Sequence, residues 1–176
     1  VARQAMKYTC TRQLPDGSWY YGEEPKYRWI DNFHTGYNLD ALKCYIENTG
    51  DEIYGDHLKR GFEFFKNTFF ELSGRPKYYH NRTFPIDSQC CSQAIETLSN
   101  FSEDDPSSLN LAMNVAKWTI KNMQDQDGHF YFMRYPLMLM TLKVPMIHWA
   151  QATTYKALAL LLLKLKKNSK DSNHVR

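Results

Sequence analysis

Two aspartates of the chain could provide a pair of carboxyl groups for acid–base chemistry. Asp31 and Asp87 each come directly before a helical pattern, and Asp87 follows Asp31 by 56 residues. Two carboxyl groups that flank a glycosidic bond can hydrolyse it when the pKa of one is raised, so that it acts as an acid. Capping of a helix N-terminus explains an Asp at this place equally well. The pattern predicts Asp31 and Asp87 as catalytic, with Glu23 as a substitute, and leaves capping open.

Histidine, tyrosine and arginine side chains would suit a different reaction. In an epimerase or lyase, His34 or Tyr79 could abstract a proton beside a carboxylate while Arg134 neutralises the enolate. The flat apolar face of Trp149 could stack on a pyranose ring, although such a ring could also belong to the core. We therefore predict His34 as a third catalytic residue. The predicted substrate-binding residues are Tyr21, Glu23, Tyr79, His80, Arg134, His148, Trp149 and Gln151.

Metal and cofactor chemistry has no support in the sequence. His34 and His148 lack the His-Glu spacing of metal-binding motifs. The four cysteines are Cys10, Cys44, Cys90 and Cys91, and they contain no Cys-x-x-Cys pair. Cys44, Cys90 and Cys91 lie within predicted helices, which favours buried, reduced thiols and a reducing cytosol. We expect no metal, no cofactor and a cytoplasmic protein.

The composition fits one globular domain of 176 residues. The net charge of +3 comes mainly from the C-terminal segment "KLKKNSKDSNHVR", and no basic stripe indicates a nucleic acid as partner. The apolar run "ALALLLL" (157–163) is too short to cross a membrane. Aromatic residues make up 15% of the chain, which is typical both of packed helical proteins and of carbohydrate clefts. We expect neither nucleic acid nor membrane as a partner.

Helical periodicity dominates the chain, so the expected fold class is all-α. Apolar residues recur at helical spacing in six segments. These segments are residues 1–13, 33–49, 54–69, 86–101, 106–123 and 148–166. Asp51 and Asp105 can each cap a helix, and Gly50 can end one. The three long aromatic loops between helix pairs are residues 14–32, 72–85 and 125–147.

The loops and helices form an internal repeat. The loop segments "GSWYYGE", "GRPKYYHN" and "GHFYFMR" each place an aromatic pair shortly after a glycine. Leu98 repeats Leu42 at the same spacing at which Asp87 repeats Asp31. Each unit consists of a long loop, a helix, a short turn and a second helix. A repeat of this kind predicts about three helical hairpins that stack and bury one another.

A second repeated motif joins a glutamine to an aromatic residue six positions later. The segment "QLPDGSW" (13–19) recurs as "QDQDGHF" (124–130), each time where a helix ends and a loop begins. The glutamine can bond open backbone groups at the helix end, and the aromatic ring after the glycine can cover it. We interpret Gln13, Gly17 and Trp19 as a structural clamp.

Three hairpins of this kind resemble half of an (α/α)6 toroid, in which inner and outer helices alternate around a ring. The segments "WIDNFHTGYNLDAL", "FPIDSQCCSQAIETL" and "MIHWAQATTYKALALLL" are similar to the six-hairpin glycosidase-like enzymes and relatives found with polysaccharide-biosynthesis genes. The resemblance covers about residues 12–166. It implies that the N-termini of helices 33–49, 86–101 and 148–166 and the long loops before them form a sugar-binding cleft on one face. Helix amides there would also favour an anionic group such as a uronate carboxylate.

The resemblance implies a carbohydrate-active protein, and hydrolysis at a sugar or uronic-acid residue of a polysaccharide is the expected function. A non-catalytic carbohydrate-binding or accessory module would keep the aromatic cleft and use both aspartates only as caps. A terpenoid cyclase-like toroid is the other alternative, because the glutamine-to-aromatic motif resembles the Gln-to-Trp repeats of terpene cyclases. The Asp-rich motif of such cyclases is missing.

Three hairpins cannot close a ring. We therefore expect residues 1–168 to be a partial toroid domain, the C-terminal piece of a longer chain, and residues 169–176 to be a disordered basic tail. Part of the broadly apolar helix 148–166 would stay uncovered. Either further hairpins from the upstream sequence or a second copy of the chain should cover it.

Overall fold

The computed structural model describes residues 1–135 and 140–174. Its α-helices are α1 (Ala2–Thr11), α2 (Asn32–Thr49), α3 (Gly55–Thr68), α4 (Ser88–Asn100), α5 (Pro106–Met123) and α6 (Thr153–His174). Two 3₁₀ turns, η1 (Pro25–Tyr27) and η2 (Glu52–Tyr54), and a π-helical turn, η3 (Ile147–Ala152), lie between them. The expected all-α fold is confirmed, and the helices coincide with the six periodic segments.

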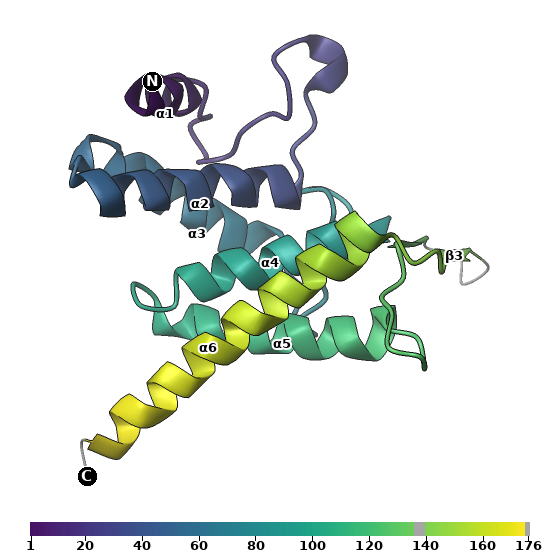
Figure 1. Cartoon of the computed structure of the whole chain (residues 1–176). Helices are drawn as coiled ribbons and strands as arrows, with labels where there is room; N and C mark the ends of the chain where they lie inside the picture. Colours follow the sequence, from purple (N-terminus) through teal and green to yellow (C-terminus); the bar gives the residue numbers. More distant parts are fainter. Residues whose placement is uncertain (136–139, 175–176) are drawn as a thin grey trace.

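The helices form two layers (Figure 1). Helix α4 is central and packs against α2, α5 and α6, while α2 also packs against α1 and α3. The inner layer is thus α2, α4 and α6, and the outer layer is α1, α3 and α5. The three inner helices begin at the same end of the molecule, where the long loops also gather. The expected three hairpins with their loops on one face are confirmed.

Aspartate caps fix where three of the six α-helices begin. The caps are Asp31 for α2, Asp87 for α4 and Asp105 for α5, each accepting from a backbone N–H in the first turn. Gly50, with φ of 66°, ends α2 in the left-handed conformation that glycine adopts freely. The cap expected from Asp51 is wrong. Its carboxylate caps no helix and instead accepts from the Tyr45 hydroxyl at 2.8 Å.

The main core lies between the layers. The rings of Phe62 on α3 and Phe101 after α4 stack 4.0 Å apart, which joins two successive hairpins. Fully buried side chains here include Leu39, Leu42, Phe65, Ile95, Leu98 and Val115. Burial of an aliphatic or aromatic side chain of this size contributes roughly 1.5–3 kcal/mol relative to exposure. Packing of the helix faces therefore sets the positions of the inner-helix N-termini.

The predicted clamp holds the loops to the helix ends. The Nε2 atom of Gln13 donates to the carbonyl of Gly17 at 2.9 Å, and Nε2 of Gln124 donates to the carbonyl of Gly128 at 2.8 Å. Both glycines have positive φ, which the turn requires. Trp19 is buried, as expected of the ring that covers the clamp. The structural interpretation of both motifs is confirmed.

A short antiparallel sheet ties the third loop to the start of α4. Its strands are β1 (Ile86–Asp87), β2 (Met133–Arg134) and β3 (Thr141–Leu142), in the order β1–β2–β3. Ile86 lies opposite Arg134, and Met133 lies opposite Leu142. The sequence did not predict these strands, because two-residue strands leave no detectable alternation.

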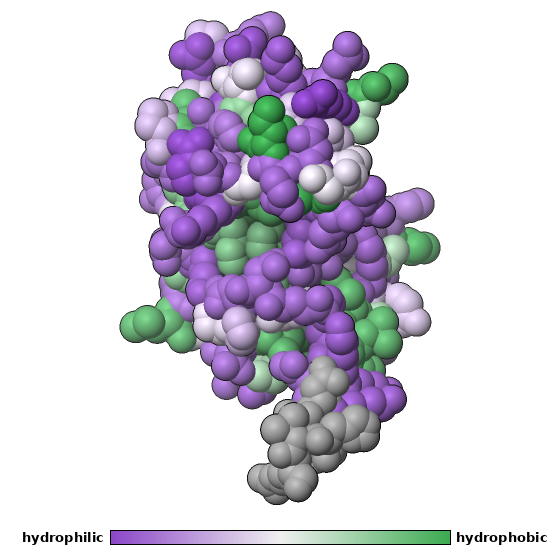
Figure 2. Space-filling model, turned by 90° about the vertical axis from the view of Figure 1, so that its left-hand side faces the viewer, coloured by the Kyte–Doolittle hydropathy of each residue, from purple (hydrophilic) through white to green (hydrophobic). Residues whose placement is uncertain are grey.

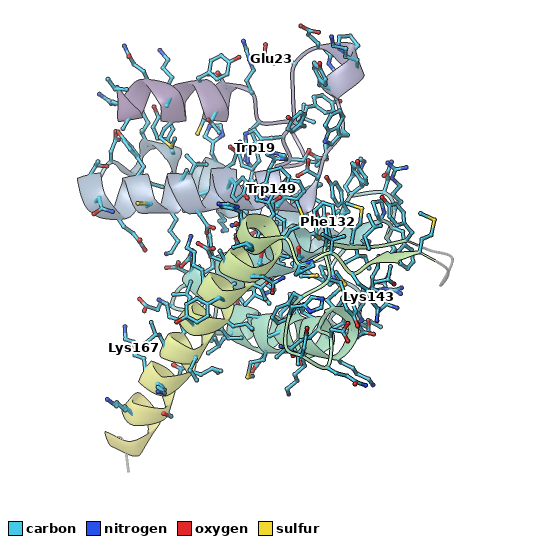
Figure 3. The ribbon with its side chains drawn as sticks, turned by 45° about the vertical axis from the view of Figure 1, so that its right-hand side comes forward. Trp19, Glu23, Phe132, Lys143, Trp149 and Lys167 are labelled. Carbon is cyan, nitrogen blue, oxygen red and sulfur yellow. The ribbon has the colours of Figure 1, made fainter. Side chains whose placement is uncertain are left out.

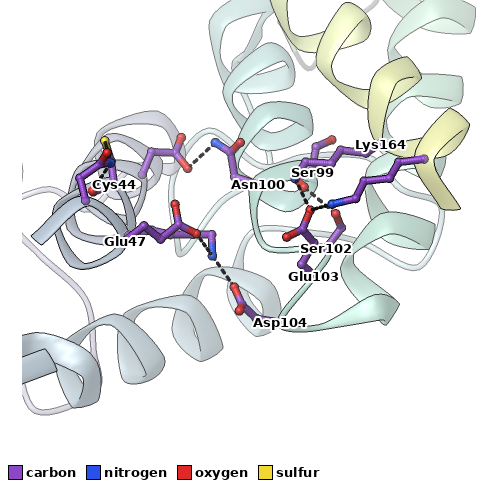
Figure 4. Close-up of polar contacts among 12 residues, drawn as sticks. Cys44, Glu47, Ser99, Asn100, Ser102, Glu103, Asp104 and Lys164 are labelled. Atoms are coloured by element: carbon purple, nitrogen blue, oxygen red, sulfur yellow. Dashed lines mark hydrogen bonds and ion pairs between the residues drawn. The ribbon is translucent and has the colours of Figure 1, made fainter. Parts of the chain in front are cut away.

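Polar side chains connect α2 to α4. Asp40 of α2 accepts from Gln93 at 2.6 Å, from Thr97 at 3.0 Å and from Asn100 at 3.0 Å, all on α4. Figure 4 shows Asn100 reaching across to the carboxylate. Burial raises the pKa of Asp40 to about 6, even though the three hydrogen bonds favour its charged form. This network fixes the relative position of the two helices along their length.

Ion pairs connect α6 to α4 in the same manner. Lys156 lies 2.6 Å from Glu96, and Lys164 lies 3.0 Å from Glu103 near the other end of α4 (Figure 4). Solvent-exposed pairs of this type contribute little free energy, typically about 0.2–1 kcal/mol each. The apolar contact of α6 with the core comes from Ala157 and Leu161, which are both buried.

One flank of α6 is uncovered in this chain. Ala157 and Leu161 are buried, whereas Tyr155, Leu162 and Leu163 are exposed. Residues 169–174, which the sequence assigned to a disordered basic tail, belong to α6, and residues 175 and 176 of that tail lie outside the described part. None of the described helices combines the length and the apolar character that crossing a membrane requires.

The four thiols are unpaired. Cys10, Cys90 and Cys91 are buried, in agreement with the expectation for the last two. Burial of Cys44 was expected and is wrong. It lies on the exposed side of α2, because the apolar stripe of this helix follows Leu39, Leu42 and Ile46 instead.

Candidate functional site

A pocket opens beside the N-terminus of α2, at the end of the molecule where the loops gather. It has a volume of about 280 Å³. Its lining residues are Trp19, Tyr20, Tyr21, Asp31, His34, Thr35, Tyr37 and Asn38. Three of the predicted site residues, Tyr21, Asp31 and His34, therefore meet in one place. Half of the lining residues are Trp or Tyr, and such rings can stack on the rings of a sugar.

Asp31 and His34 form a close pair at the base of this pocket. Nδ1 of His34 lies 2.9 Å from each carboxylate oxygen of Asp31. The Asp31 side chain is fully buried and also accepts from the backbone N–H of His34 and from Nε1 of Trp29 at 3.0 Å. The imidazole is 38% exposed. Because Nδ1 is engaged by the carboxylate, Nε2 is the atom left for a ligand in the pocket.

Asp87 lies at the N-terminus of the neighbouring helix α4, and it is also buried. Its Oδ1 accepts from the backbone N–H of Cys90 at 2.6 Å. Burial raises the pKa of Asp87 to about 7, and the negative charge of Asp31 adds to this rise. The Cys90 N–H bond opposes the rise and is outweighed. Asp87 is therefore a carboxyl group that can carry a proton near neutral pH.

The charge of Asp31 acts on Asp87, although Asp87 is not among the residues that line the pocket beside α2. A tyrosine that the sequence reading passed over, Tyr78, shares their surroundings. Burial, followed by the charges of Asp87 and Asp31 among other groups, raises the pKa of the Tyr78 hydroxyl well above its usual value. Its ring packs edge-on against Phe33 at 5.2 Å. Tyr79, the residue that we predicted, is adjacent to Tyr78 in the chain and lies opposite Asp31.

Aromatic rings from the first loop line the outer side of the pocket. Tyr21 stacks on Trp29 with ring centroids 4.4 Å apart, and its ring meets His34 edge-on at 4.5 Å. Tyr21 is 47% exposed, so its ring is available to a ligand. Trp29 and Tyr37 were not among the predicted residues. The alternation of aromatic residues in "YRWIDNFHTGY" was the signal that could have found them.

Tyr79 and His80 come from the second loop and pair with the chain just before α2. Tyr79 lies opposite Asp31 in an antiparallel bridge, and the backbone N–H of His80 donates to the carbonyl of Ile30 at 3.2 Å. The two loops thus form one short ribbon beside the Asp31–His34 pair. The ribbon places Tyr79 and His80 next to the Asp31–His34 pair.

Glu23 and Arg134 are not brought to the pocket. The carboxylate of Glu23 accepts from the hydroxyl of Tyr8 and pairs with Arg12, and these contacts lower the pKa of Glu23. Figure 3 shows Glu23 beside α1 and away from Trp149. The guanidinium of Arg134 donates to the carbonyl of Asn122 at 2.9 Å. Arg134 is therefore held at the end of α5.

Trp149, which Figure 3 labels, lies in η3, the turn before α6, and is exposed. His148 precedes it in the same turn and is also exposed. The carbonyl of Trp149 accepts from Oγ of Ser88 at 3.1 Å, which holds this turn against the start of α4. Gln151 is occupied differently. Its amide accepts from the N–H of Phe130 at 2.9 Å and donates to the carbonyl of the same residue at 2.8 Å. Gln151 therefore locks the third loop onto α6 and has little left to offer a ligand.

One buried polar side chain lies behind Asp31 without a partner. Among the described residues, neither amide atom of Asn32 has a hydrogen-bond partner, and the side chain is fully buried. Burial of an unpaired amide is costly. The described residues also contain no group of three or more His, Cys, Asp or Glu side chains arranged to hold a metal ion.

A larger hollow, of about 760 Å³, lies at the opposite end of the molecule, which Figure 2 faces. Hydrophobic side chains, among them Ile46, Phe62 and Phe101, form its floor, and hydrophilic ones form its rim. Two of its rim lysines, Lys43 and Lys66, are already paired with aspartates. The hollow contains none of the predicted site residues and no histidine. We therefore place the candidate site at the smaller pocket beside α2.

Comparison with known proteins supports the fold. No known protein family and no curated protein matches the sequence significantly. Among solved structures, a cellobiose 2-epimerase from Spirochaeta thermophila matches 94% of this chain with a TM-score of 0.74 and 13% identity. A cellobiose 2-epimerase from Bacillus thermoamylovorans matches 90% with a TM-score of 0.68 and 10% identity. An unsaturated glucuronyl hydrolase specific for heparin matches 89% with a TM-score of 0.59 and 18% identity.

These matches cover 50%, 48% and 45% of the other chains, so this chain spans about half the length of the solved structures it matches. The chain has the fold of part of an α/α toroid, the fold of the six-hairpin glycosidase-like enzymes. The fold that the sequence resemblance implied is confirmed.

Proposed function

We propose that this chain forms the sugar-binding and proton-transferring part of a carbohydrate-active α/α toroid. The observation that carries the proposal is the Asp31–His34 pair, in which a buried carboxylate holds Nδ1 of an imidazole whose ring faces an aromatic pocket. In this arrangement Asp31 positions the ring, and Nε2 of His34 is the group that transfers protons. The names of the structural neighbours, which are sugar epimerases and a glucuronyl hydrolase, support a sugar as the substrate.

The pair suits proton abstraction from a carbon beside a carbonyl group of a sugar. Nε2 of His34 would take the proton, and the electrons of the C–H bond would form the enediolate. Return of a proton to the opposite face of the carbon would give the epimer. Asp87, whose pKa is raised to about 7, is a suitable donor for that proton near neutral pH. Tyr21 and Trp149 would stack on the rings of the substrate.

Hydrolysis of a glycosidic bond is the second candidate. The raised pKa of Asp87 supports it, because a glycosidase needs one carboxyl group that is still protonated when it acts as the acid. Asp31 is less suited to be the partner carboxylate. Its side chain is fully buried and already accepts from Trp29 and from two donors of His34. A polysaccharide-binding module without catalysis is the remaining alternative.

Deuterium exchange separates these functions. Purified protein is incubated in D₂O with cellobiose and with an oligomer of glucuronic acid, and the products are followed by NMR. Epimerisation puts deuterium on the reacting carbon, whereas hydrolysis creates new reducing ends without that exchange. We expect exchange that is lost in His34→Gln with sugar binding retained. The control is Tyr155→Ala, which removes an exposed aromatic ring from the flank of α6 and should leave both exchange and sugar binding unchanged. Sugar binding without exchange or cleavage would favour the binding module, and no binding would end the proposal.

We also propose which neighbours this domain, residues 1–168, packs against and in which compartment it lies. Further helical hairpins, from the upstream sequence or from a second copy, would cover the exposed flank of α6 at Tyr155, Leu162 and Leu163. The four unpaired thiols support a reducing cytosol as the compartment. We propose no metal and no cofactor for the reaction, because proton transfer by His34 and Asp87 requires neither.

A further inference from the structure

A second pocket adjoins the candidate site on the other side of Trp29. It has a volume of about 200 Å³ and belongs to the ribbon formed by the first two loops. Its lining residues are Arg28, Trp29, Tyr79, His80, Asn81 and Arg82. Trp29 separates the two pockets, because its ring stacks on Tyr21 of the candidate site and its Nε1 donates to Asp31. A ligand that extends past the Trp29 ring would occupy both.

The ribbon fixes the distance between the new pocket and the catalytic pair. Asp31 lies opposite Tyr79, and Tyr79 in turn lies opposite Arg82. Paired chains lie about 4.8 Å apart, so the backbone of Arg82 is on the order of 10 Å from that of Asp31. This spacing suits the sugar unit next to the one bound at His34.

Neither arginine of this pocket forms an ion pair within the described residues, although the charge of Arg28 also acts on the nearby carboxylate of Glu23. In the described part of the chain, the arginines that form ion pairs are Arg3, Arg12 and Arg75. Arg28 instead donates from Nε to the backbone carbonyl of Glu23 at 2.9 Å, and the Arg82 guanidinium lies 4.2 Å above the ring of Tyr79. Stacking on the ring orients the Arg82 guanidinium but does not neutralise it.

We propose that this second pocket binds an anionic substituent, a carboxylate or a sulfate, on the sugar unit next to the reacting one. The inference rests on the proposed function. Guanidinium groups bind carboxylates and sulfates through paired, charge-assisted N–H donors, and two of them facing one small pocket repel each other until an anion is present. The indole face of Trp29 provides the stacking surface for the ring that carries the anion. The substrate is therefore an acidic polysaccharide.

Matched oligosaccharides test the proposal by calorimetric titration. Cellotetraose is the neutral probe, and its C6-oxidised and 6-sulfated forms have the same linkages with carboxylates or sulfates added. We expect at least one acidic form to bind about tenfold more tightly than cellotetraose at low salt, and the gain to shrink at high salt. The form that gains identifies the anion as carboxylate or sulfate. Because arginine stays charged, the gain should persist from pH 6 to pH 9.

Variants assign the preference to the two arginines. The double variant Arg28→Gln and Arg82→Gln should lose the tenfold gain while its affinity for cellotetraose stays within about twofold of the wild type. The double variant to Lys should keep part of the gain, because it keeps the charge and loses the paired donors. Arg3→Gln, an exposed arginine beside Asp51, is the control and should behave as the wild type.

Two results would overturn the inference. In the first, the wild-type protein binds cellotetraose and both acidic forms equally; the proposed function then survives and the anion pocket does not. In the second, the acidic preference persists in the double Gln variant, which places the anion elsewhere. A protein that binds none of the three probes would refute the proposed function and this inference together.

Discussion

Nδ1 of His34 lies 2.9 Å from both carboxylate oxygens of Asp31, and the same carboxylate caps the helix on which His34 stands. One buried side chain therefore performs two tasks. As a cap it fixes the first turn of α2, and as a hydrogen-bond partner it fixes the ring of His34. An N-cap and a residue three positions later lie close together in every helix, so the fold provides this pair from local geometry alone.

The Asp31→Asn variant separates these two tasks. Asparagine is an equally good N-cap, so the midpoint of thermal unfolding should change little. Turnover should fall by about 100-fold, because the neutral amide of asparagine replaces the negatively charged carboxylate that positions the ring of His34. Steady-state kinetics by NMR and thermal unfolding by circular dichroism measure the two effects. Asp105→Asn, at the equivalent cap of α5, is the control. Unchanged turnover in Asp31→Asn would show that the pair is only structural.

Asp87 should give the activity its upper pH limit. Burial raises its pKa to about 7, and a general acid loses its proton as the pH rises through its pKa. Turnover should therefore decline above about pH 7. In Asp87→Asn this decline should vanish and turnover below pH 7 should fall by about 100-fold. A wild-type profile that stays flat to pH 9 would remove Asp87 from the mechanism.

Asp40 should make the stability of the fold depend on pH. Its pKa is raised from 3.8 to about 6 in the folded state, so the folded state binds the proton more tightly than the unfolded state. Its contribution to stability is complete below about pH 4 and is lost as the pH rises to about 6. The loss is on the order of 3 kcal/mol. Urea unfolding from pH 4 to pH 7 should show this decline, and Asp40→Asn should reduce it. An equal decline in both proteins would assign it to another group.

Gln151 should prove more important for stability than for sugar binding. Its amide makes two hydrogen bonds to the backbone of Phe130, and truncation would leave both groups of a buried residue unpaired. Gln151→Ala should lower the free energy of unfolding by about 2 kcal/mol. The affinity of the folded protein for oligosaccharides should stay the same. Gln126→Ala, at an exposed position of the third loop, is the control. A selective loss of sugar binding would return Gln151 to the binding residues.

The sequence by itself determined the helices and their order. Local rules act within a few residues: apolar spacing marks a helix face, Asp31, Asp87 and Asp105 cap, and Gly50 ends a helix. The repeat then implied hairpins with the long loops at one end. The sequence also predicted that Tyr21, Asp31 and His34 belong to one site. The three residues lie close together along the chain, so the loop and the helix that follows it bring them together.

Only the tertiary structure decided which distant side chains share a site. Glu23 meets Arg12, and Arg134 meets the end of α5, because the loops that carry them fold back onto outer helices. The raised pKa of Asp87 depends on burial and on a charge 56 residues away in the chain, which no local pattern encodes. The pairing of the first two loops likewise brings Arg28 and Arg82 to one pocket. The spacing of apolar residues along the chain determines which face of each helix is buried. The packing of those faces determines which distant side chains meet in one site and how their pKa values change.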